Sequence, residues 1–516
     1  MKKQNRFLSI FTAITCLTTF LFAADGDFIG TDPYTVTIYN WSDSSNWRDG
    51  NVPDGAGDVA YITNAIFPGN TADAKGIALD SNPTVEKLFI SLDKSEEDAV
   101  SVALALGTIT LEGDDPEINV ATAPNFLGAF LGVTSDGYGG VLAGTSGFKK
   151  TGNGTLFLDG DHTISGTLNL NEGSVWLNWP NSAQYLDVQV NSNAVLLAGK
   201  HTNNINSVTV NSGGDFEPLA DPRQNPFYIF SPSIIIKSNG YFRIADLYGL
   251  DIRGSNITVQ SGGSIFCPFS QSFVVYNDIK LEGRGHIGGA IEVWNASANG
   301  VFNGPLVMTD DTRIFQHGET GSLTFNAPFS GDGSLVFIGQ SDSYLNEKTY
   351  YLNAQNVHNG ATSLQTLNCS TYYEIGTNDC FPTAHPLEFL IHNWSNSVLL
   401  QVNMNDFVQT VPSLNLACGE GEDTIMLNGN PGSKLSVLTN VTQSGGIAKI
   451  VGTQLEIAGN LAVNGSMLGM SNVLFLAGSS IGGSGTIDKI TVPTGVTVAP
   501  GNSIGTTCAS RVSFYT

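Results

Sequence analysis

The feature that most constrains this chain is a short phrase that returns at intervals in the twenties. Each copy consists of an apolar strand, a turn of Asn, Ser or Gly, and a second strand. The copies VQVNSNAVLLAG, VTVNSGGDFEP, IIIKSNGYFRI and ITVQSGGSIF begin at Val188, Val208, Ile234 and Ile257, so their starts are 20, 26 and 23 residues apart. This period, with two or three strands in it, is that of one coil of a parallel β-helix. Each strand is therefore expected to pair with its counterpart in the next coil.

The stretch KKTGNGTLFLDGDHTISGTLNLNEGSVWL, residues 149–177, follows the same rhythm. Apolar and polar residues alternate in three short runs, which is the period of a strand and not of a helix. The alternating apolar residues are Leu156, Leu158, Leu168, Leu170, Val175 and Leu177. Glycines fall between the runs, where turns need positive φ or a backbone without Cβ. We predict an all-β chain that forms a right-handed parallel β-helix with an N-terminal cap.

Composition agrees with an exported solenoid. Charged residues make up only 13% of the 516 residues, so Asn, Ser, Thr and Asp must keep the surface soluble. The formal net charge of −24 would repel phosphate backbones, and nucleic acid is therefore not an expected partner. At about 4.8 Å per coil, some twenty coils would form a rod on the order of 100 Å long.

The first residues, MKKQNRFLSIFTAITCLTTFLFAADG, combine a basic start, an apolar run and small residues before Asp25. This pattern predicts a secretory signal peptide over residues 1–24. Nothing later reaches about 18 consecutive apolar residues, so no transmembrane helix is expected. The expected location is the cell surface, the outer membrane or the extracellular space of a Gram-negative bacterium, or the periplasm if no translocator is present.

The remainder of the chain divides by the strength of the rhythm. Trp41 and Trp47 stand among polar residues and are expected to cover the exposed end of the first coil. The expected regions are a cap with the first coils at 25–140, regular coils at 141–340, an irregular excursion at 341–400 and further coils at 401–516.

Five cysteines remain after the signal peptide: Cys267, Cys369, Cys380, Cys418 and Cys508. An odd number cannot all pair within one chain. Cys369 and Cys380 are close in sequence, and export permits oxidation, so a disulfide that closes this loop is the expected pairing. No cysteine or histidine spacing predicts a zinc site.

Three phrases in the chain resemble the autotransporter-associated β-strand repeat. The clearest copy is the Lys-Thr-Gly-x-Gly-Thr-Leu-x-Leu-x-Gly phrase, matched by Lys150, Thr151, Gly152, Gly154, Thr155, Leu156, Leu158 and Gly160. NDFVQTVPSLNL at 405–416 is similar to the Gln-Thr-x-x-Ser-Leu element, and VTVAPGNSIGT at 496–506 is similar to the phrase near the end of such arrays. The resemblance implies an autotransporter passenger domain, a β-helical rod often used in adhesion or host contact.

The resemblance is incomplete at the C-terminal end. Passengers of this family are followed by a translocating β-barrel, but only TTCASRVSFYT follows Gly505. The expectation is either a passenger whose translocator is encoded downstream or export by another route. GGAI at 288–291 and FPGN at 67–70 resemble the tetrapeptide repeats of chlamydial polymorphic membrane proteins.

Some β-helices cleave polysaccharides, which makes catalysis the main alternative. GRGHIGG at 283–289 is superficially similar to a polygalacturonase phrase, and Asp310 with Asp311 would supply paired carboxylates. In that family the aspartates precede the histidine, whereas here they follow His286. We therefore predict no catalytic, cofactor-binding or metal-binding residues.

The remaining candidate surface is aromatic, with Trp176, Trp179, Trp294 and Trp394 as its tryptophans and further tyrosines near 350 and 372. Such side chains stack on sugars or fill partner pockets, unless they pack between coils. The expected function is adhesion or host contact, with a surface protein or glycan as partner. A secreted polysaccharide lyase or hydrolase, or a secreted scaffold that associates with itself, remains the alternative.

Overall fold

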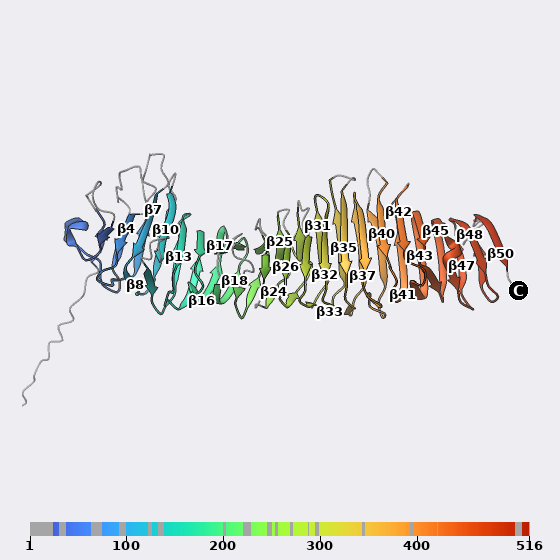
Figure 1. Cartoon of the computed structure of the whole chain (residues 1–516), viewed down its shortest axis with the longest axis horizontal. Helices are drawn as coiled ribbons and strands as arrows, with labels where there is room; N and C mark the ends of the chain where they lie inside the picture. The colour runs from blue at the N-terminus through green and yellow to red at the C-terminus, as the bar shows by residue number, and fades with distance from the viewer. Residues whose placement is uncertain are drawn as a thin grey trace, which may run out of the picture.

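The chain forms one elongated stack of β-coils, which tapers little along its length (Figure 1). Pairings between the named strands are all parallel in the part of the chain that the structure describes, which confirms the predicted all-β parallel β-helix. This computed structural model describes residues 24–29, 38–62, 75–91, 100–121, 126–132, 139–199, 203–219, 229–244, 250–252, 256–268, 272–286, 288–294, 299–342, 346–392, 397–419, 422–500 and 508–514.

The coils have three sides, and each side is a ladder of strands from successive coils. The first ladder belongs to a sheet of 15 strands in which each strand pairs with the one a coil later. Its strands are β1 (Gly26–Asp27), β3 (Val59–Ile62), β6 (Lys87–Ile90), β9 (Glu117–Val120), β12 (Phe148–Thr151), β14 (Gly166–Leu170), β16 (Ala183–Val190), β18 (Asn203–Val210), β21 (Ile234–Ile236), β24 (Ile257–Val259), β27 (Ile279–Leu281), β30 (Leu306–Met308), β33 (Phe329–Gly331) and β36 (Val357–His358), with β20 (Ile229–Phe230) beside β18.

The second ladder forms another side of the coil. It runs nearly the whole length of the rod, again with parallel pairing from coil to coil. Its strands are β2 (Ile38–Asn40), β4 (Lys75–Ala78), β7 (Val100–Ala105), β10 (Phe126–Gly132), β13 (Thr155–Asp159), β15 (Gly173–Leu177), β17 (Ala194–Gly199), β19 (Asp215–Leu219), β22 (Tyr241–Arg243), β25 (Ser264–Cys267), β28 (Ile291–Val293), β31 (Thr312–His317), β34 (Leu335–Gln340), β37 (Thr362–Leu367), β39 (Leu387–His392), β41 (Val408–Ala417), β43 (Lys434–Val451), β45 (Asn460–Leu468), β47 (Ser480–Gly483) and β49 (Thr497–Pro500).

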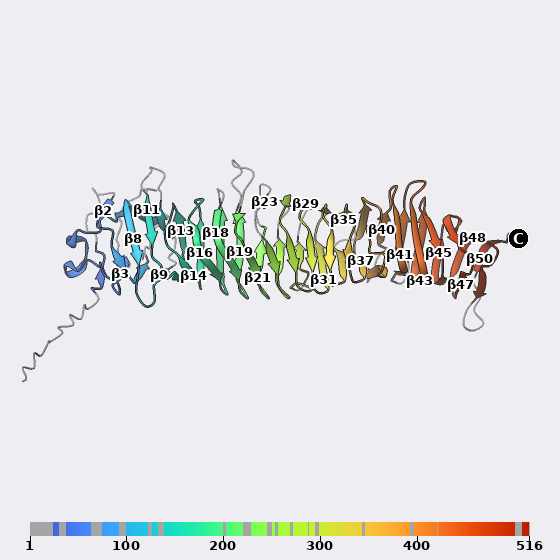
Figure 2. The ribbon, with the colours of Figure 1, turned by 90° about the horizontal axis from the view of Figure 1, so that it is seen from below.

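The third ladder completes the coil, and the view turned by 90° shows that the rod is about equally narrow in both directions (Figure 2). Near the C-terminal end, β43 bends around the coil and pairs with strands of more than one side. The remaining strands are β5 (Thr84–Val85), β8 (Gly107–Leu111), β11 (Gly140–Ala143), β23 (Leu250–Ile252), β26 (Phe273–Val275), β29 (Asn299–Phe302), β32 (Gly321–Phe325), β35 (Glu347–Leu352), β38 (Ser370–Ile375), β40 (Leu399–Asn403), β42 (Thr424–Asn428), β44 (Gln454–Ile457), β46 (Val473–Phe475), β48 (Thr486–Val492) and β50 (Cys508–Phe514).

Helical structure is minimal. The described residues contain three short 3-10 helices, η1 (Ser44–Asn46), η2 (Arg48–Gly50) and η3 (Met470–Asn472). Among these residues we find no helix with the length and apolar character needed to cross a membrane. The predicted signal peptide falls almost entirely on residues 1–23, which lie outside the described residues.

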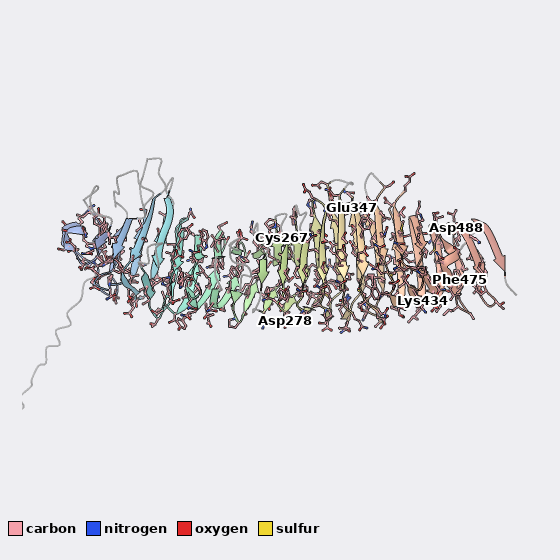
Figure 3. All side chains as sticks on the ribbon, in the orientation of Figure 1. Cys267, Asp278, Glu347, Lys434, Phe475 and Asp488 are labelled. Carbon is pink, nitrogen blue, oxygen red and sulfur yellow. The ribbon has the colours of Figure 1, made fainter. Side chains whose placement is uncertain are left out.

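The recurring phrase stacks in register, as its spacing predicts. Val188 pairs with Val208, Val208 with Ile234, and Ile234 with Ile257. The extra residues of the longer periods are therefore accommodated in the turns. All four side chains are buried in one continuous aliphatic core, whose burial is the main force that holds the coils together. Polar side chains such as Asp278 and Glu347 project from opposite edges of the rod (Figure 3).

The N-terminal end is covered by an aromatic cluster, as predicted. The rings of Trp41 and Trp47 are 4.8 Å apart, and Phe28 lies 5.3 Å from Trp47. Each indole N–H also finds an acceptor: Trp41 donates to the carbonyl of Pro53 at 2.9 Å and Trp47 donates to the carbonyl of Trp41 at 2.7 Å. The cluster thus buries large apolar area and satisfies its polar atoms at the end of the stack.

The predicted irregular excursion at 341–400 is wrong, because this segment continues the coils. β35 pairs with β32 before it and β38 after it, and β37 pairs with β34 and β39. The apolar rhythm fades because the inward positions hold Tyr350, Tyr373 and Lys348 in place of aliphatic residues. The two buried tyrosine rings stack at 5.2 Å, and their hydroxyls donate to carbonyls of Ile338 and Gln365. Aromatic and polar side chains can therefore occupy the interior without interrupting the strands.

The predicted disulfide is also not present, since Cys369 and Cys380 are both free and buried. The six-residue strand β38 separates them, and an extended strand of that length covers about 20 Å. A disulfide needs Cα atoms within roughly 7 Å. The Cys369 thiol instead contacts the hydroxyls of Thr366 and Thr371, and Cys380 donates to the carbonyl of Leu352 at 3.6 Å. Burial raises the pKa of both thiols.

Candidate binding pocket

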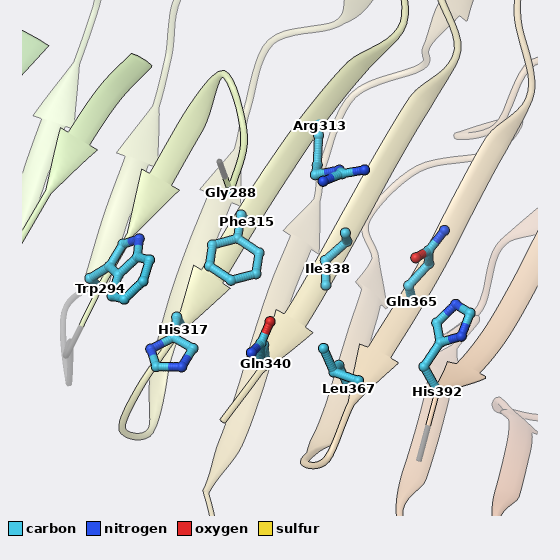
Figure 4. A pocket seen from close by; sticks show the side chains of 10 residues that line it. All are labelled: Gly288, Trp294, Arg313, Phe315, His317, Ile338, Gln340, Gln365, Leu367 and His392. Carbon is cyan, nitrogen blue, oxygen red and sulfur yellow. The ribbon is translucent and has the colours of Figure 1, made fainter. Parts of the chain in front are cut away.

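A pocket of about 460 Å³ opens on the outer face of the second ladder, across β28, β31, β34, β37 and β39. We call it the lateral pocket. Its lining consists of Gly288, Trp294, Arg313, Phe315, His317, Ile338, Gln340, Gln365, Leu367 and His392 (Figure 4). Five parallel strands at about 4.8 Å spacing give the pocket a reach of roughly 19 Å along the rod.

The alternation of β31 explains how the lining forms. In the sequence TRIFQH, Thr312, Ile314 and Gln316 are buried in the interior, which places the residues between them on the outer face. Stacking then sets the rows, because Phe315 pairs with Ile338 and Ile338 with Gln365. A second row follows the same registers from His317 through Gln340 and Leu367 to His392.

Three rings of the lining, those of Trp294, Phe315 and His317, lie in contact with one another. Trp294 lies 4.7 Å from His317 and 6.0 Å from Phe315, measured between ring centroids. The indole N–H of Trp294 donates to the Glu292 carboxylate at 3.1 Å, and the hydroxyl of Ser264 donates to the same carboxylate at 2.8 Å. Glu292 is itself buried, so the orientation of Trp294 is determined before any partner arrives.

Two basic side chains in the pocket keep unsatisfied donors or acceptors. His317 is only 8% exposed, and its Nδ1 has no hydrogen-bond partner, while its Nε2 lies 3.6 Å from Asp342. The Nε of Arg313 is likewise buried without a partner. Burial, together with the charge of nearby Arg284, lowers the pKa of Arg313. Both side chains therefore carry hydrogen-bonding capacity that the protein itself does not use.

The charge of the lining is opposite to that of the chain as a whole. Acidic residues outnumber basic ones 46 to 22 in the sequence, yet the ten lining residues contain an arginine and two histidines and no carboxylate. A smaller hollow of about 210 Å³ adjoins the pocket and shares Arg313 and Gln365 with it. This hollow contains two arginines. Arg284 is paired with Asp311 at 3.3 Å, whereas Arg313 has no acidic partner among the described residues.

The aromatic residues singled out from the sequence have different locations. Trp294 lines the lateral pocket, whereas Trp176 packs against Phe157 on the same ladder, at 5.2 Å, several coils away. Tyr350 and Tyr373 belong to the core and not to the surface. Trp394 lies outside the described residues.

The residues of the polygalacturonase-like alternative do not converge on one site. His286 bonds with the hydroxyl of Tyr241 at 2.7 Å. Asp311 accepts from the backbone N–H of Ser334 and from Arg284, and its neighbour Asp310 accepts from the N–H of Asp311. The two carboxylates thus lie in one turn, where each accepts a hydrogen bond from a backbone N–H. They are not placed on opposite sides of a site for a sugar ring, as glycoside hydrolysis requires. Among the described residues no group of three or more His, Cys, Asp and Glu could hold a metal ion.

The repeat phrase serves the coils themselves. Leu156 and Leu158 are buried in the core, and Thr155 bonds with Ser174 of the next coil at 2.7 Å. Gly152 takes positive φ directly after β12, and Gly160 does so directly after β13. Gly154 lies so close to the carbonyls of the preceding coil that a Cβ would come within 2.8 Å of them.

Lys150 and Thr151 complete the phrase at the end of β12. Lys150 is fully buried, and its ammonium donates to the carbonyls of Thr151, Gly152 and Glu172 at 2.9, 2.7 and 3.2 Å. The hydroxyl of Thr151 donates to the carboxylate of Glu117. These eight residues form a structural unit that is distant in sequence from the lateral pocket.

Sequence reasoning missed most of the pocket. Arg313, Phe315 and His317 lie in the TRIFQH run, whose outward positions carry two rings and a cation in place of the usual small polar residues. That departure was a usable signal. Gln340, Gln365, Leu367 and His392 carry no such signal, because each becomes part of the pocket only through the stacking of its strand.

No protein-family model, curated protein or solved structure matches this chain. The resemblance to autotransporter passengers consequently stays a prediction based on the three phrases.

Proposed function

We propose that this protein is an exported β-helical rod of the passenger type, which contacts a partner at a cell surface through the lateral pocket. Its role is adhesion or host contact, and its mechanism is binding without catalysis. The observation that carries the proposal is an aromatic pocket, already ordered by buried hydrogen bonds, in the wall of a rigid rod.

The architecture supports a role in presentation. In a stacked parallel sheet every interior strand is paired on both sides, so the walls are stiff and side chains project at fixed spacings. Partners of such a rod meet side chains and turns and not free backbone. A mostly apolar pocket with a few convergent polar groups is the usual form of a binding site.

The pocket chemistry favours binding over glycan cleavage. Hydrolysis of glycosides by the usual route requires two carboxyl groups that flank the scissile bond. The lining offers arginine, histidine and amide groups, which can bind and orient a sugar or a peptide. The absence of catalysis is part of the proposal and is open to direct assay against polysaccharides.

A cell-binding assay tests this function. Fluorescently labelled protein is incubated with candidate host and neighbouring cells, and a Trp294→Ala/Phe315→Ser variant is expected to lose at least tenfold in apparent affinity, because it removes two of the three rings. Trp176→Ala is the matched control, since this ring also lies on the second ladder but outside the pocket. Equal binding of the double variant and the wild type would place the adhesive surface elsewhere.

A further inference from the structure

We propose that the lateral pocket binds an acidic polysaccharide segment lying along the rod, with Arg313 as the group that receives a sugar carboxylate. The inference rests on the proposed function, in that it names the chemical class of the partner that the pocket accepts.

The charge pattern points to an anionic ligand. Arg313 is half-buried and its Nε has no partner. The carboxylates around the pocket contact other groups: Asp311 is paired with Arg284, Glu292 accepts from Ser264 and Trp294, and Asp342 lies 3.6 Å from Nε2 of His317. An arginine is planar and presents its donors as a fork that matches a carboxylate. Figure 4 shows the Arg313 guanidinium extending over the neighbouring strand toward Ile338 and Gln365. A carboxylate placed there would satisfy a cation that the protein leaves without a counter-ion.

The other lining groups fit sugar rings. Trp294 and Phe315 offer flat apolar surfaces beside each other, which suit the C–H faces of pyranose rings. Gln340 adds one acceptor and two donors for hydroxyl groups, and Gln365 adds its acceptor and one donor, since its amide already donates to Ser363 at 2.9 Å. Polar groups therefore recur along the pocket at the coil spacing of about 4.8 Å, which suits a ligand made of repeating polar units.

A peptide fits the same surface less well. Peptides that bind to sheets usually add a strand at an exposed edge, where free backbone N–H and C=O groups pair with them. β31, β34 and β37 are each paired on both sides, so the pocket offers a peptide no edge. A ligand here must be recognised by side chains alone. Acidic glycans are the class that combines a carboxylate, hydroxyl groups and apolar ring faces.

The test is calorimetric binding of the purified chain to three acidic probes: oligogalacturonate, hyaluronan oligosaccharide and sialyllactose. Methyl-esterified oligogalacturonate and lactose are the matched neutral probes. At least one acidic probe should bind, its neutral form should bind at least tenfold more weakly, which corresponds to about 1.4 kcal/mol, and added salt should weaken binding. If no acidic probe binds, or if the neutral forms bind equally well, the inference is overturned.

Variants separate this inference from the proposed function. The Arg313→Gln variant should bind the acidic probe at least tenfold more weakly than the wild type, while its weak affinity for the neutral probe stays the same. Arg313→Lys should restore part of the lost affinity. Lys280→Gln is the control, because this exposed cation is paired with Glu282 and does not line the pocket. If Trp294→Ala abolishes cell binding but Arg313→Gln does not change it, the pocket is adhesive and its ligand is not acidic. Binding of an acidic peptide in preference to every glycan probe would likewise overturn the inference.

Discussion

Buried polar side chains that bond to turn carbonyls recur along the interior of this rod. Lys150 does so at the end of β12, and Lys348 does the same with the carbonyls of Gly318 and Glu319. Gln409 and Gln443 fulfil the same role with amides: Gln443, for example, donates to the carbonyl of Gly445 and accepts from the N–H of Gly465. A lysine in this position is costly, because its charge is removed from water.

The burial of the Lys150 ammonium predicts that the stability of the fold depends on pH. Burial lowers the pKa of Lys150 to about 7 from the ordinary value of 10.5, and the charge of Glu172 offsets part of that effect. Between these two values the unfolded chain holds a proton that the folded chain lacks, so stability rises with pH across this window and is lowest below about pH 7. The difference between the two pKa values limits the change in the free energy of unfolding to roughly 5 kcal/mol.

Lys150→Gln should remove most of this dependence, since glutamine serves the same kind of position at Gln409 and Gln443. The measurement is the urea midpoint of wild type and variant at a series of pH values from 6 to 10. The two curves are expected to diverge toward low pH, where the variant is the more stable. Parallel curves would mean that the Lys150 ammonium is effectively solvated in the folded chain.

At the scale of elements, asparagine ladders tie successive turns together. Asn191 donates to Asn171 at 2.8 Å, and Asn211 donates to Asn191 at 2.7 Å, one coil apart in each case. Another row of asparagines joins Asn303, Asn326 and Asn353, with 2.8 Å between donor and acceptor at each step. In such a ladder each interior amide both donates and accepts, so its loss leaves two neighbours unpaired.

Asn191→Ala is therefore expected to destabilise the chain by about 1–3 kcal/mol, and Asn171→Ala by roughly half as much because it takes part in one ladder bond. Hydrogen exchange of the backbone amides in β14, β16 and β18 reports this locally. The interior variant should speed exchange in the coils on both sides of it. Equal effects of the two variants would show that the side-chain bonds do not act as a ladder.

At the scale of the whole molecule, the stack determines shape. A rod on the order of 100 Å long has a radius of gyration of roughly 30 Å, compared with about 24 Å for a compact domain of the same number of residues. Small-angle scattering from the purified chain should give the larger value and an asymmetric distance distribution. A radius of gyration that doubles as the protein concentration is raised would instead indicate that rods associate, in agreement with the scaffold alternative.

Local sequence pattern by itself determined the strands, their inward faces and the register of the four phrase copies. The reason is that a period of two residues and a coil length in the twenties leave few other ways to bury the first residue of each copy. It failed where the interior is not aliphatic, as at Tyr350 and Tyr373, and where sequence proximity was taken for spatial proximity, as at Cys369 and Cys380.

Only the tertiary structure decided the lateral pocket. Its lining comes from residues 288–392, and these side chains become neighbours because each coil returns to the same face one strand spacing later. The sequence shows that Arg313 points outward, since it alternates with buried residues of β31. That it has no acidic partner depends on which side chains of the adjacent coils stack beside it, and stacking across coils is a property of the fold.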